Sequence, residues 1–113
     1  MVTIYHNPRC RKSRETLQLL ENEWAQIVIK EYLKEPLSKE ELSGLVDLLK
    51  IKPFDLIRKN EDVYKANFKG KDLSDEEWLE VMITYPKLME RPIVLSGNSA
   101  VIGRPPENAL TIL

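Results

Sequence analysis

One cysteine offers most of the chemistry that this sequence carries. Cys10 is the single cysteine among 113 residues, and basic residues crowd around it: Arg9, Arg11, Lys12 and Arg14. A strand-like run precedes it and a helical pattern follows, so Cys10 is expected at a helix start. Backbone N–H groups and the helix dipole favour an anion there, and cations add to the effect. We therefore expect a reactive thiolate with a pKa below about 8.5, rather than a buried structural thiol.

The arginines are a second set of candidate binding residues. The planar fork of arginine suits bidentate binding of an oxyanion, whereas lysine acts as a point charge. The helix faces expected to meet solvent use lysine, and the Lys- and Glu-rich stretches 30–41 and 69–77 are expected as solvated surface. The arginines are only six in number: Arg9, Arg11, Arg14, Arg58, Arg91 and Arg104.

Two of these arginines are expected to lie opposite each other. Gly97-Asn98 is a two-residue hairpin turn signal between two β-type runs. With this turn, paired residues have numbers that sum to 195, which places Arg91 opposite Arg104 at the open end of the hairpin.

Like charges in such a pair are destabilising, so a negative group is expected between the two arginines. This group would be either a bound anion or separate carboxylate partners, of which Glu90 and Glu107 are the nearest. The remaining alternative is that the pair is simply solvated. Pro92 and Pro105 follow the two arginines and hold their backbones in extended geometry, as an anion clamp requires.

His6 and Ser13 flank the cysteine at four residues before and three residues after. His6 either tunes the charge of Cys10 or is simply a packed or solvated side chain. Ser13 either donates to the thiolate or caps the helix, and the strong preference of serine for the cap position favours capping.

The elements that position these residues begin with a βαβ unit. Val2–Tyr5 is predicted as a strand, residues 13–22 as a helix, and Ile27–Ile29 as a buried strand. The crossover between the strands is expected to be right-handed. The helix has its apolar residues on one side: Leu17, Leu20 and Trp24.

The middle of the chain is predicted to be helical. Two helices begin with capping boxes, Ser38 with Glu41 and Ser74 with Glu77, and the second ends before Pro86. Apolar residues recur at i, i+3, i+4 and i+7 in both: Leu42, Leu45, Val46 and Leu49, then Trp78, Val81, Met82 and Tyr85.

The remaining segments complete the predicted order βαβ, helices, ββα. Residues 53–59 are expected as a short helix, 60–72 as a polar connection, and 92–95 with 100–102 as the hairpin. A terminal helix begins near Pro105 and carries Ala109, Leu110 and Leu113. The order suits an α/β fold of thioredoxin type: a four-stranded mixed sheet in a single domain, residues 1–113, with a helical insertion at about 38–86.

Composition narrows the class of protein. With 42% hydrophobic and 31% charged residues, the chain can bury the core of one domain. A net charge of −1 argues against broad nucleic-acid binding, and no apolar run approaches the ~20 residues of a membrane span. The N-terminus shows no signal peptide. One cysteine and one histidine allow neither an internal disulfide nor a zinc site. We expect a cytoplasmic monomer without bound metal.

The segment His6-Asn7-Pro8-Arg9-Cys10, followed by Ser13-Arg14, resembles the ArsC family of glutaredoxin-linked arsenate reductases, which have a thioredoxin-like fold. The resemblance runs from Ile4 to Leu113, and because plasmid-type members continue beyond that point, the chain resembles the short chromosomal branch. Further matching segments follow in the same order: Leu56-Ile57-Arg58-Lys59-Asn60, Glu90-Arg91-Pro92-Ile93-Val94 and Gly103-Arg104-Pro105-Pro106-Glu107.

The resemblance implies that Cys10 is the nucleophile that attacks arsenate, and that Arg58, Arg91 and Arg104 bind the oxyanion. The developing charge would be held by these arginines. It implies glutathione as co-substrate and second thiol, glutaredoxin as the partner that resolves the mixed disulfide, and no bound cofactor. Supporting roles would fall to His6, Ser13 and Arg14, and Pro92 matches a position that often has a cis bond in such folds.

Two alternative functions remain open. Arg11-Lys12 replaces a small Gly-Thr type pair and would alter the shape or preference of the anion site. A first alternative is a glutathione-linked thiol oxidoreductase with little arsenate activity. A second is a regulator that binds transcription machinery, like the Spx proteins. Those proteins use a Cys-x-x-Cys switch, and Ser13 in the second position counts against this reading.

Overall fold

The computed structural model describes residues 1–23 and 26–112. The chain forms two compact units, Met1–Glu35 together with Arg91–Leu113, and Pro36–Glu90. The helical insertion expected at about 38–86 falls within the second unit.

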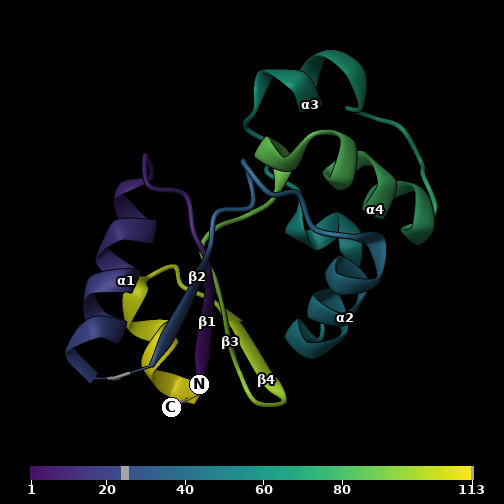
Figure 1. The fold of residues 1–113 in the computed structure, drawn as a ribbon. Coiled ribbons are helices and arrows are strands. Elements are labelled where there is room, and N and C mark those ends of the chain that lie inside the picture. Colours follow the sequence, from purple (N-terminus) through teal and green to yellow (C-terminus); the bar gives the residue numbers. More distant parts are fainter. Residues whose placement is uncertain (24–25, 113) are drawn as a thin grey trace. The chain divides into compact units, whose positions relative to one another are not determined.

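A four-stranded mixed sheet is the centre of the first unit, as the sequence predicts (Figure 1). Its order is β2-β1-β3-β4, with β1 parallel to β2, β3 antiparallel to β1, and β4 antiparallel to β3. The strands are Val2–Tyr5 (β1), Ile27–Lys30 (β2), Ile93–Ser96 (β3) and Ser99–Ile102 (β4). This arrangement is the α/β, thioredoxin-like sheet expected from the element order.

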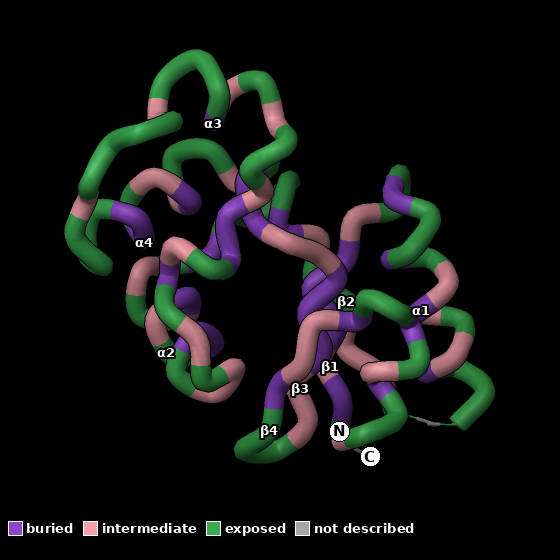
Figure 2. The backbone as a smooth tube through the Cα atoms, turned by 180° about the vertical axis from the view of Figure 1, so that it is seen from behind, coloured by how far each residue is buried: buried purple, intermediate pink, exposed green. Residues whose placement is uncertain are grey.

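The core of the first unit lies between the sheet and two helices. Helix α1 spans Arg11–Glu23, and the terminal 3-10 helix η3 spans Pro106–Ile112 and packs with α1. The backbone is most buried along the central strands β1 and β3 (Figure 2). Fully buried side chains from four elements meet here: Val2, Ile4, Leu20, Val94 and Ala109.

Strand β2 is less buried than the sequence predicts. Ile27 and Val28 are half-buried, and Ile29 is 47% exposed. The run of apolar residues is typical of a central strand, but β2 lies at an edge of the sheet, where one neighbour is missing. The expectation of a buried strand is therefore wrong for Ile29.

The hairpin has the predicted register. Ile93 pairs with Ile102 and Ser96 with Ser99, so the residue numbers of each pair sum to 195. Gly97 takes φ +58° at the first turn position, a conformation that glycine adopts without strain.

The second unit is helical. Its elements are α2 (Lys39–Leu49), η1 (Pro53–Leu56), α3 (Asp62–Asn67), α4 (Asp75–Thr84) and η2 (Pro86–Leu88). Ser38 accepts a hydrogen bond from the Glu41 N–H, and Ser74 with Glu77 forms a complete capping box. Its aromatic core surrounds Trp78, with ring centroids 5.0 Å from Phe54, 6.4 Å from Tyr64 and 6.2 Å from Phe68.

Three local predictions need correction. Residues 60–72 are not only a polar connection, because they contain α3, whose Tyr64 is buried against Trp78. The helix expected at 53–59 is the shorter η1, and the terminal helix is a 3-10 helix that begins at Pro106 and leaves Leu110 exposed. Leu17 and Leu20 face the core as predicted, whereas Trp24 and Leu113 lie outside the described residues.

None of the helices in the described ranges combines the length and apolar character that crossing a membrane demands.

Candidate functional site

The loop between β1 and α1 folds back on itself and presents Cys10 at the helix start. The Cys10 N–H donates to the Asn7 carbonyl at 3.0 Å, and the Cys10 carbonyl accepts from the Arg14 N–H at 3.0 Å, which begins the helical ladder. The Asn7 side chain also accepts from the Arg9 N–H at 3.0 Å. Cys10 therefore lies where the free N–H groups of α1 point outward, as the sequence predicts.

The pKa of the Cys10 thiol is lowered from its usual value. Burial alone raises this pKa, because Cys10 is only 9% exposed. The N–H of Ser13, the charge of Arg91, the N–H of Lys12 and a hydrogen bond from Arg91 outweigh it and stabilise the thiolate. The pKa of Cys10 is thus lowered despite its burial, which makes the charged, nucleophilic form more accessible.

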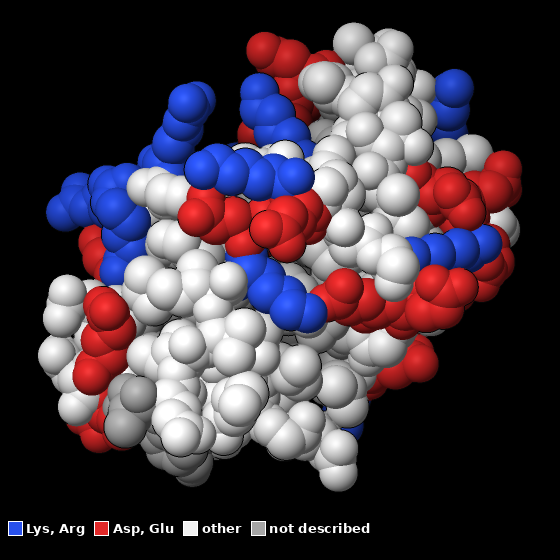
Figure 3. Space-filling model, viewed as in Figure 1, with Lys and Arg blue, Asp and Glu red and all other residues white. Residues whose placement is uncertain are grey.

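The N–H groups at the helix start lower this pKa as the sequence predicts, but the cation that lowers it differs from those expected. The sequence suggested the four basic neighbours of Cys10, whose exposed side chains gather over the start of α1 (Figure 3). Arg11 instead pairs with Glu15 at 3.1 Å with its side chain 84% exposed, and Lys12 also pairs with Glu15. The effective cation is Arg91, which follows Cys10 by 81 positions in the chain.

Arg91 has donors to offer to a ligand. Its Nε and Nη1 atoms are buried and have no hydrogen-bond partner among the described residues. Buried unpaired donors are costly, and a guanidinium suits two oxygens of one anion. Arg91 beside the Cys10 thiolate therefore fits an oxyanion that the sulfur attacks.

Arg104 is the second predicted arginine of this unit. It follows strand β4 of the hairpin, whereas Arg91 precedes strand β3. Pairing continues past the strands, because the Gly103 N–H donates to the Pro92 carbonyl at 2.8 Å. Arg91 comes directly before Pro92, and Arg104 comes directly after Gly103. The peptide bonds Arg91–Pro92 and Arg104–Pro105 are both cis. The bond before Pro92 is the one that the resemblance implied.

Arg58 belongs to the second unit. Its Nη1 lies 2.6 Å from Glu61 Oε1, with the two side chains 19% and 16% exposed, and 3.4 Å from the Lys87 carbonyl. Its backbone is held by a bond from its N–H to the Leu88 carbonyl at 2.7 Å. The binding role of Arg58 rests on the family resemblance.

His6 and Ser13 act together beneath the loop. His6 Nδ1 lies 2.6 Å from Ser13 Oγ, which also accepts from the Asn7 N–H at 3.1 Å. Burial is the largest effect on the pKa of His6 and lowers it, helped by Arg14, while Glu31 and Glu21 act in the opposite direction. His6 is therefore a buried, neutral side chain near pH 7.

The prediction that Ser13 caps the helix is wrong. Helix α1 begins at Arg11, two residues earlier than the expected start, so Ser13 lies inside the first turn and is fully buried. Its hydroxyl is used by the loop instead. Arg14 supports the same loop, because its Nη1 donates to the Pro8 carbonyl at 2.9 Å.

Known proteins are similar to this chain over nearly its whole length. A model of the ArsC family matches residues 5–112. The uncharacterized protein YfgD of Escherichia coli K12 is 45% identical, with 99% of this chain and 96% of the relative covered. An arsenate reductase of Haemophilus influenzae is also 45% identical over 99% of this chain and 98% of its own length. The solved structure of an arsenate reductase from Vibrio cholerae has a TM-score of 0.94 at 45% identity, with 99% and 97% covered.

Proposed function

The chain belongs to the ArsC family, and from this premise we propose that it reduces arsenate to arsenite through the Cys10 thiolate. The observation that carries the proposal is the pairing of Cys10 with Arg91. A buried thiol of lowered pKa lies beside a guanidinium whose Nε and Nη1 have no partner among the described residues. Relatives at 45% identity carry the name arsenate reductase.

The first step is attack of the Cys10 sulfur on arsenic. An S–As bond forms while an As–O bond breaks, and the departing oxygen leaves as water with protons from solvent. Negative charge on the remaining oxygens is stabilised by the free N–H groups of Arg91. Arg104 and Arg58 contribute further positive charge, as the family resemblance implies.

The reduction itself needs a second thiol. Arsenate takes up two electrons and loses one oxygen as water, while two thiols give up those electrons and form one disulfide. The chain has a single cysteine, so the other thiol comes from outside. We propose glutathione in this role: its sulfur bonds to that of Cys10, the S–As bond breaks, and its electron pair stays on arsenic.

A mixed disulfide between Cys10 and glutathione then remains. We propose that glutaredoxin reduces it by thiol–disulfide exchange and restores the Cys10 thiolate. The cycle uses only thiols, so the protein would act without a bound cofactor or metal. A free thiol persists in a reducing compartment, and we accordingly propose that the reaction takes place in the cytoplasm.

The test is NADPH oxidation with arsenate, glutathione, glutathione reductase and glutaredoxin, together with direct measurement of arsenite. We expect arsenate-dependent turnover that disappears in Cys10→Ser. Turnover that is equal in the variant would contradict the role of Cys10. A wild-type enzyme that cycles glutathione mixed disulfides without making arsenite would instead identify a general thiol oxidoreductase.

A further inference from the structure

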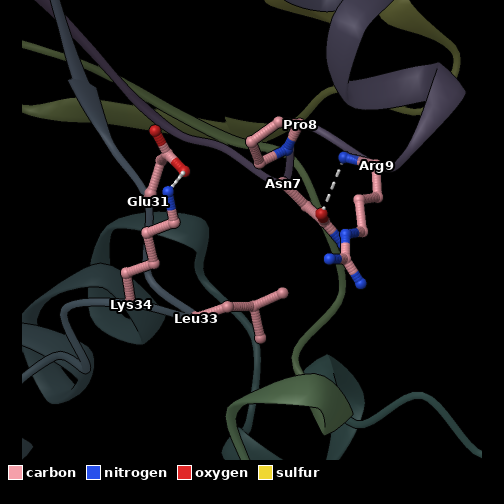
Figure 4. A pocket seen from close by; sticks show the side chains of 6 residues that line it. All are labelled: Asn7, Pro8, Arg9, Glu31, Leu33 and Lys34. Carbon is pink, nitrogen blue, oxygen red and sulfur yellow. Dashed lines mark hydrogen bonds and ion pairs between the residues drawn. The ribbon is translucent and has the colours of Figure 1, made fainter.

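A pocket of about 390 Å³ lies beside the Cys10 loop, wholly within the first unit (Figure 4). Three lining residues come from the loop between β1 and α1, and three from the segment that follows β2: Asn7, Pro8, Arg9, Glu31, Leu33 and Lys34. Its volume falls in the range of about 300–1,000 Å³ typical of small-molecule sites. The charged residues of the second segment lie in a stretch whose sequence indicates only solvated surface.

The charges around the pocket have a definite arrangement. Lys34 Nζ lies 3.5 Å from Glu31 Oε1 and forms an ion pair on one side. Arg9 extends from the other side, as Figure 4 shows, and its backbone is fixed by the bond to Asn7. Between these charges lie the Pro8 ring and the Leu33 side chain, and Leu33 is 43% exposed although it is apolar.

We infer that this pocket binds the thiol co-substrate, a short peptide with an amino-acid head at one end and a carboxylate at the other, as in glutathione. This inference rests on the proposed function, because it assigns the place from which the second thiol is delivered. Arg9 directly precedes Cys10, and three of the pocket residues belong to the loop that leads to Cys10, so we place the thiol of the bound peptide toward the nucleophile.

The ligand's charges match those of the pocket. An α-amino acid head carries an ammonium and a carboxylate, which pair with Glu31 and Lys34 respectively. The carboxylate at the far end pairs with Arg9, whose guanidinium offers a bidentate fork. The intervening methylene and peptide groups lie over Pro8 and Leu33. A small oxyanion fits less well, because it leaves the apolar centre uncovered and meets the carboxylate of Glu31.

Steady-state kinetics test the assignment. We expect Arg9→Gln and Lys34→Gln each to raise the KM for glutathione about fivefold to tenfold, as loss of one charge-assisted contact in a solvated pocket should. The KM for arsenate and the pKa of Cys10 should stay at wild-type values. Arg11→Gln is the matched control. It removes the same charge as Arg9→Gln, two positions further along the chain, but the Arg11 side chain lies outside the pocket.

A modified ligand sharpens the experiment. Glutathione monoethyl ester lacks the terminal carboxylate, so wild type and Arg11→Gln should bind it about fivefold to tenfold more weakly than glutathione. Arg9→Gln should no longer distinguish the two ligands. An equal penalty for the ester in wild type and Arg9→Gln would overturn the assignment, and so would variants that change only the KM for glutaredoxin.

Binding without turnover separates this inference from the proposed function. S-methylglutathione, which has no free thiol, is titrated into the Cys10→Ser protein and followed by NMR. Shifts centred on the pocket residues that weaken in Arg9→Gln support the site even if wild type fails to reduce arsenate. Normal arsenate reduction combined with no such shifts overturns the site and leaves the proposed function standing.

Discussion

His6 Nδ1 lies 2.6 Å from Ser13 Oγ, and both side chains are buried. The same hydroxyl accepts from the Asn7 N–H, so one serine of α1 holds two consecutive residues of the loop that leads to Cys10. The N–H of Ser13 meanwhile stabilises the Cys10 thiolate. Ser13 thus connects the end of β1, the loop and the nucleophile.

Replacement of this hydroxyl should be costly. We expect Ser13→Ala to lower the free energy of unfolding by about 1–3 kcal/mol, because the Asn7 N–H and the His6 ring lose a buried partner. Urea denaturation measures the loss. Ser99→Ala, at an exposed strand position, is the control and should change stability by no more than about 0.5 kcal/mol. Equal stability of both variants would show that the Ser13 hydroxyl contributes nothing.

The protein should lose stability as the pH falls below the ordinary pKa of histidine. The folded state lowers the pKa of His6 from 6.5, mainly through burial, so the unfolded chain takes up a proton first. The contribution of His6 to stability is therefore constant above that pH and falls between 6.5 and the lower folded pKa. Urea midpoints measured from about pH 7.5 to about pH 5 should show the slope.

His6 is the only histidine, so the origin of this slope can be isolated. The comparison is made in a Cys10→Ser background, which removes the titration of the thiol. There, His6→Gln should remove most of the slope around pH 6, whereas a slope that persists unchanged would assign it to other groups.

Arg91 should control the acidity of Cys10. We expect Arg91→Gln to raise the pKa of the thiol, because both the charge and the hydrogen bond that favour the thiolate are lost. Thiolate absorbance against pH measures this pKa. Arsenate turnover should fall about 100-fold to 1,000-fold, as when one oxyanion donor is removed.

The lysine variant separates charge from geometry. Arg91→Lys should restore much of the pKa but little of the arsenate turnover, since lysine lacks the bidentate fork. Arg11→Gln, which changes a charge directly next to Cys10 in sequence, should leave the pKa of the thiol where it is. If Arg11→Gln raised the pKa of the Cys10 thiol as much as Arg91→Gln does, the neighbouring cations and not Arg91 alone would control this pKa.

Local patterns were sufficient to predict much of the fold. Capping residues, helical spacing and the Gly97-Asn98 turn depend on neighbours within a few positions, and the elements form where these signals stand. The exposure of Ile29 depends on strand order, which periodicity does not contain. Helix α3 escaped prediction because few apolar residues interrupt a polar stretch: Val63, Tyr64, Ala66 and Phe68. Tyr64 and Phe68 pack on Trp78, which lies further along the chain.

Some features of the site also follow from local sequence, and others depend on contacts between distant residues. Cys10 at a helix start follows from local sequence, and the hairpin register singles out Arg91 and Arg104. That Arg91 rather than Arg11 stabilises the thiolate depends on a contact across 81 positions, which no local motif encodes. The sequence did not indicate that Glu31 and Lys34 line a pocket with Arg9, because this depends on the parallel pairing of β1 with β2.

Gly103 should tolerate no side chain, because it packs tightly where α1 meets the hairpin. A Cβ at this position would lie 2.9 Å from Thr16 Cγ2 and Oγ1 and 3.0 Å from Pro92 Cγ. Thr16 has no room to withdraw, since it is fully buried and donates to the Lys12 and Gly103 carbonyls. Gly103→Ala should therefore lower the free energy of unfolding by about 1–3 kcal/mol.

The opposite sign is expected at Gly44, which lies on the exposed side of α2 with no atom within 4 Å of an added Cβ. Gly44→Ala should raise the free energy of unfolding by about 0.5–1 kcal/mol, because alanine loses less backbone entropy in a helix. Urea denaturation of the two variants side by side checks both signs. Because Thr16 and Pro92 flank the loops that carry Cys10 and Arg91, Gly103→Ala should also slow arsenate turnover, and Gly44→Ala should not. A Gly103→Ala protein as stable as wild type would show that the hairpin yields at this contact.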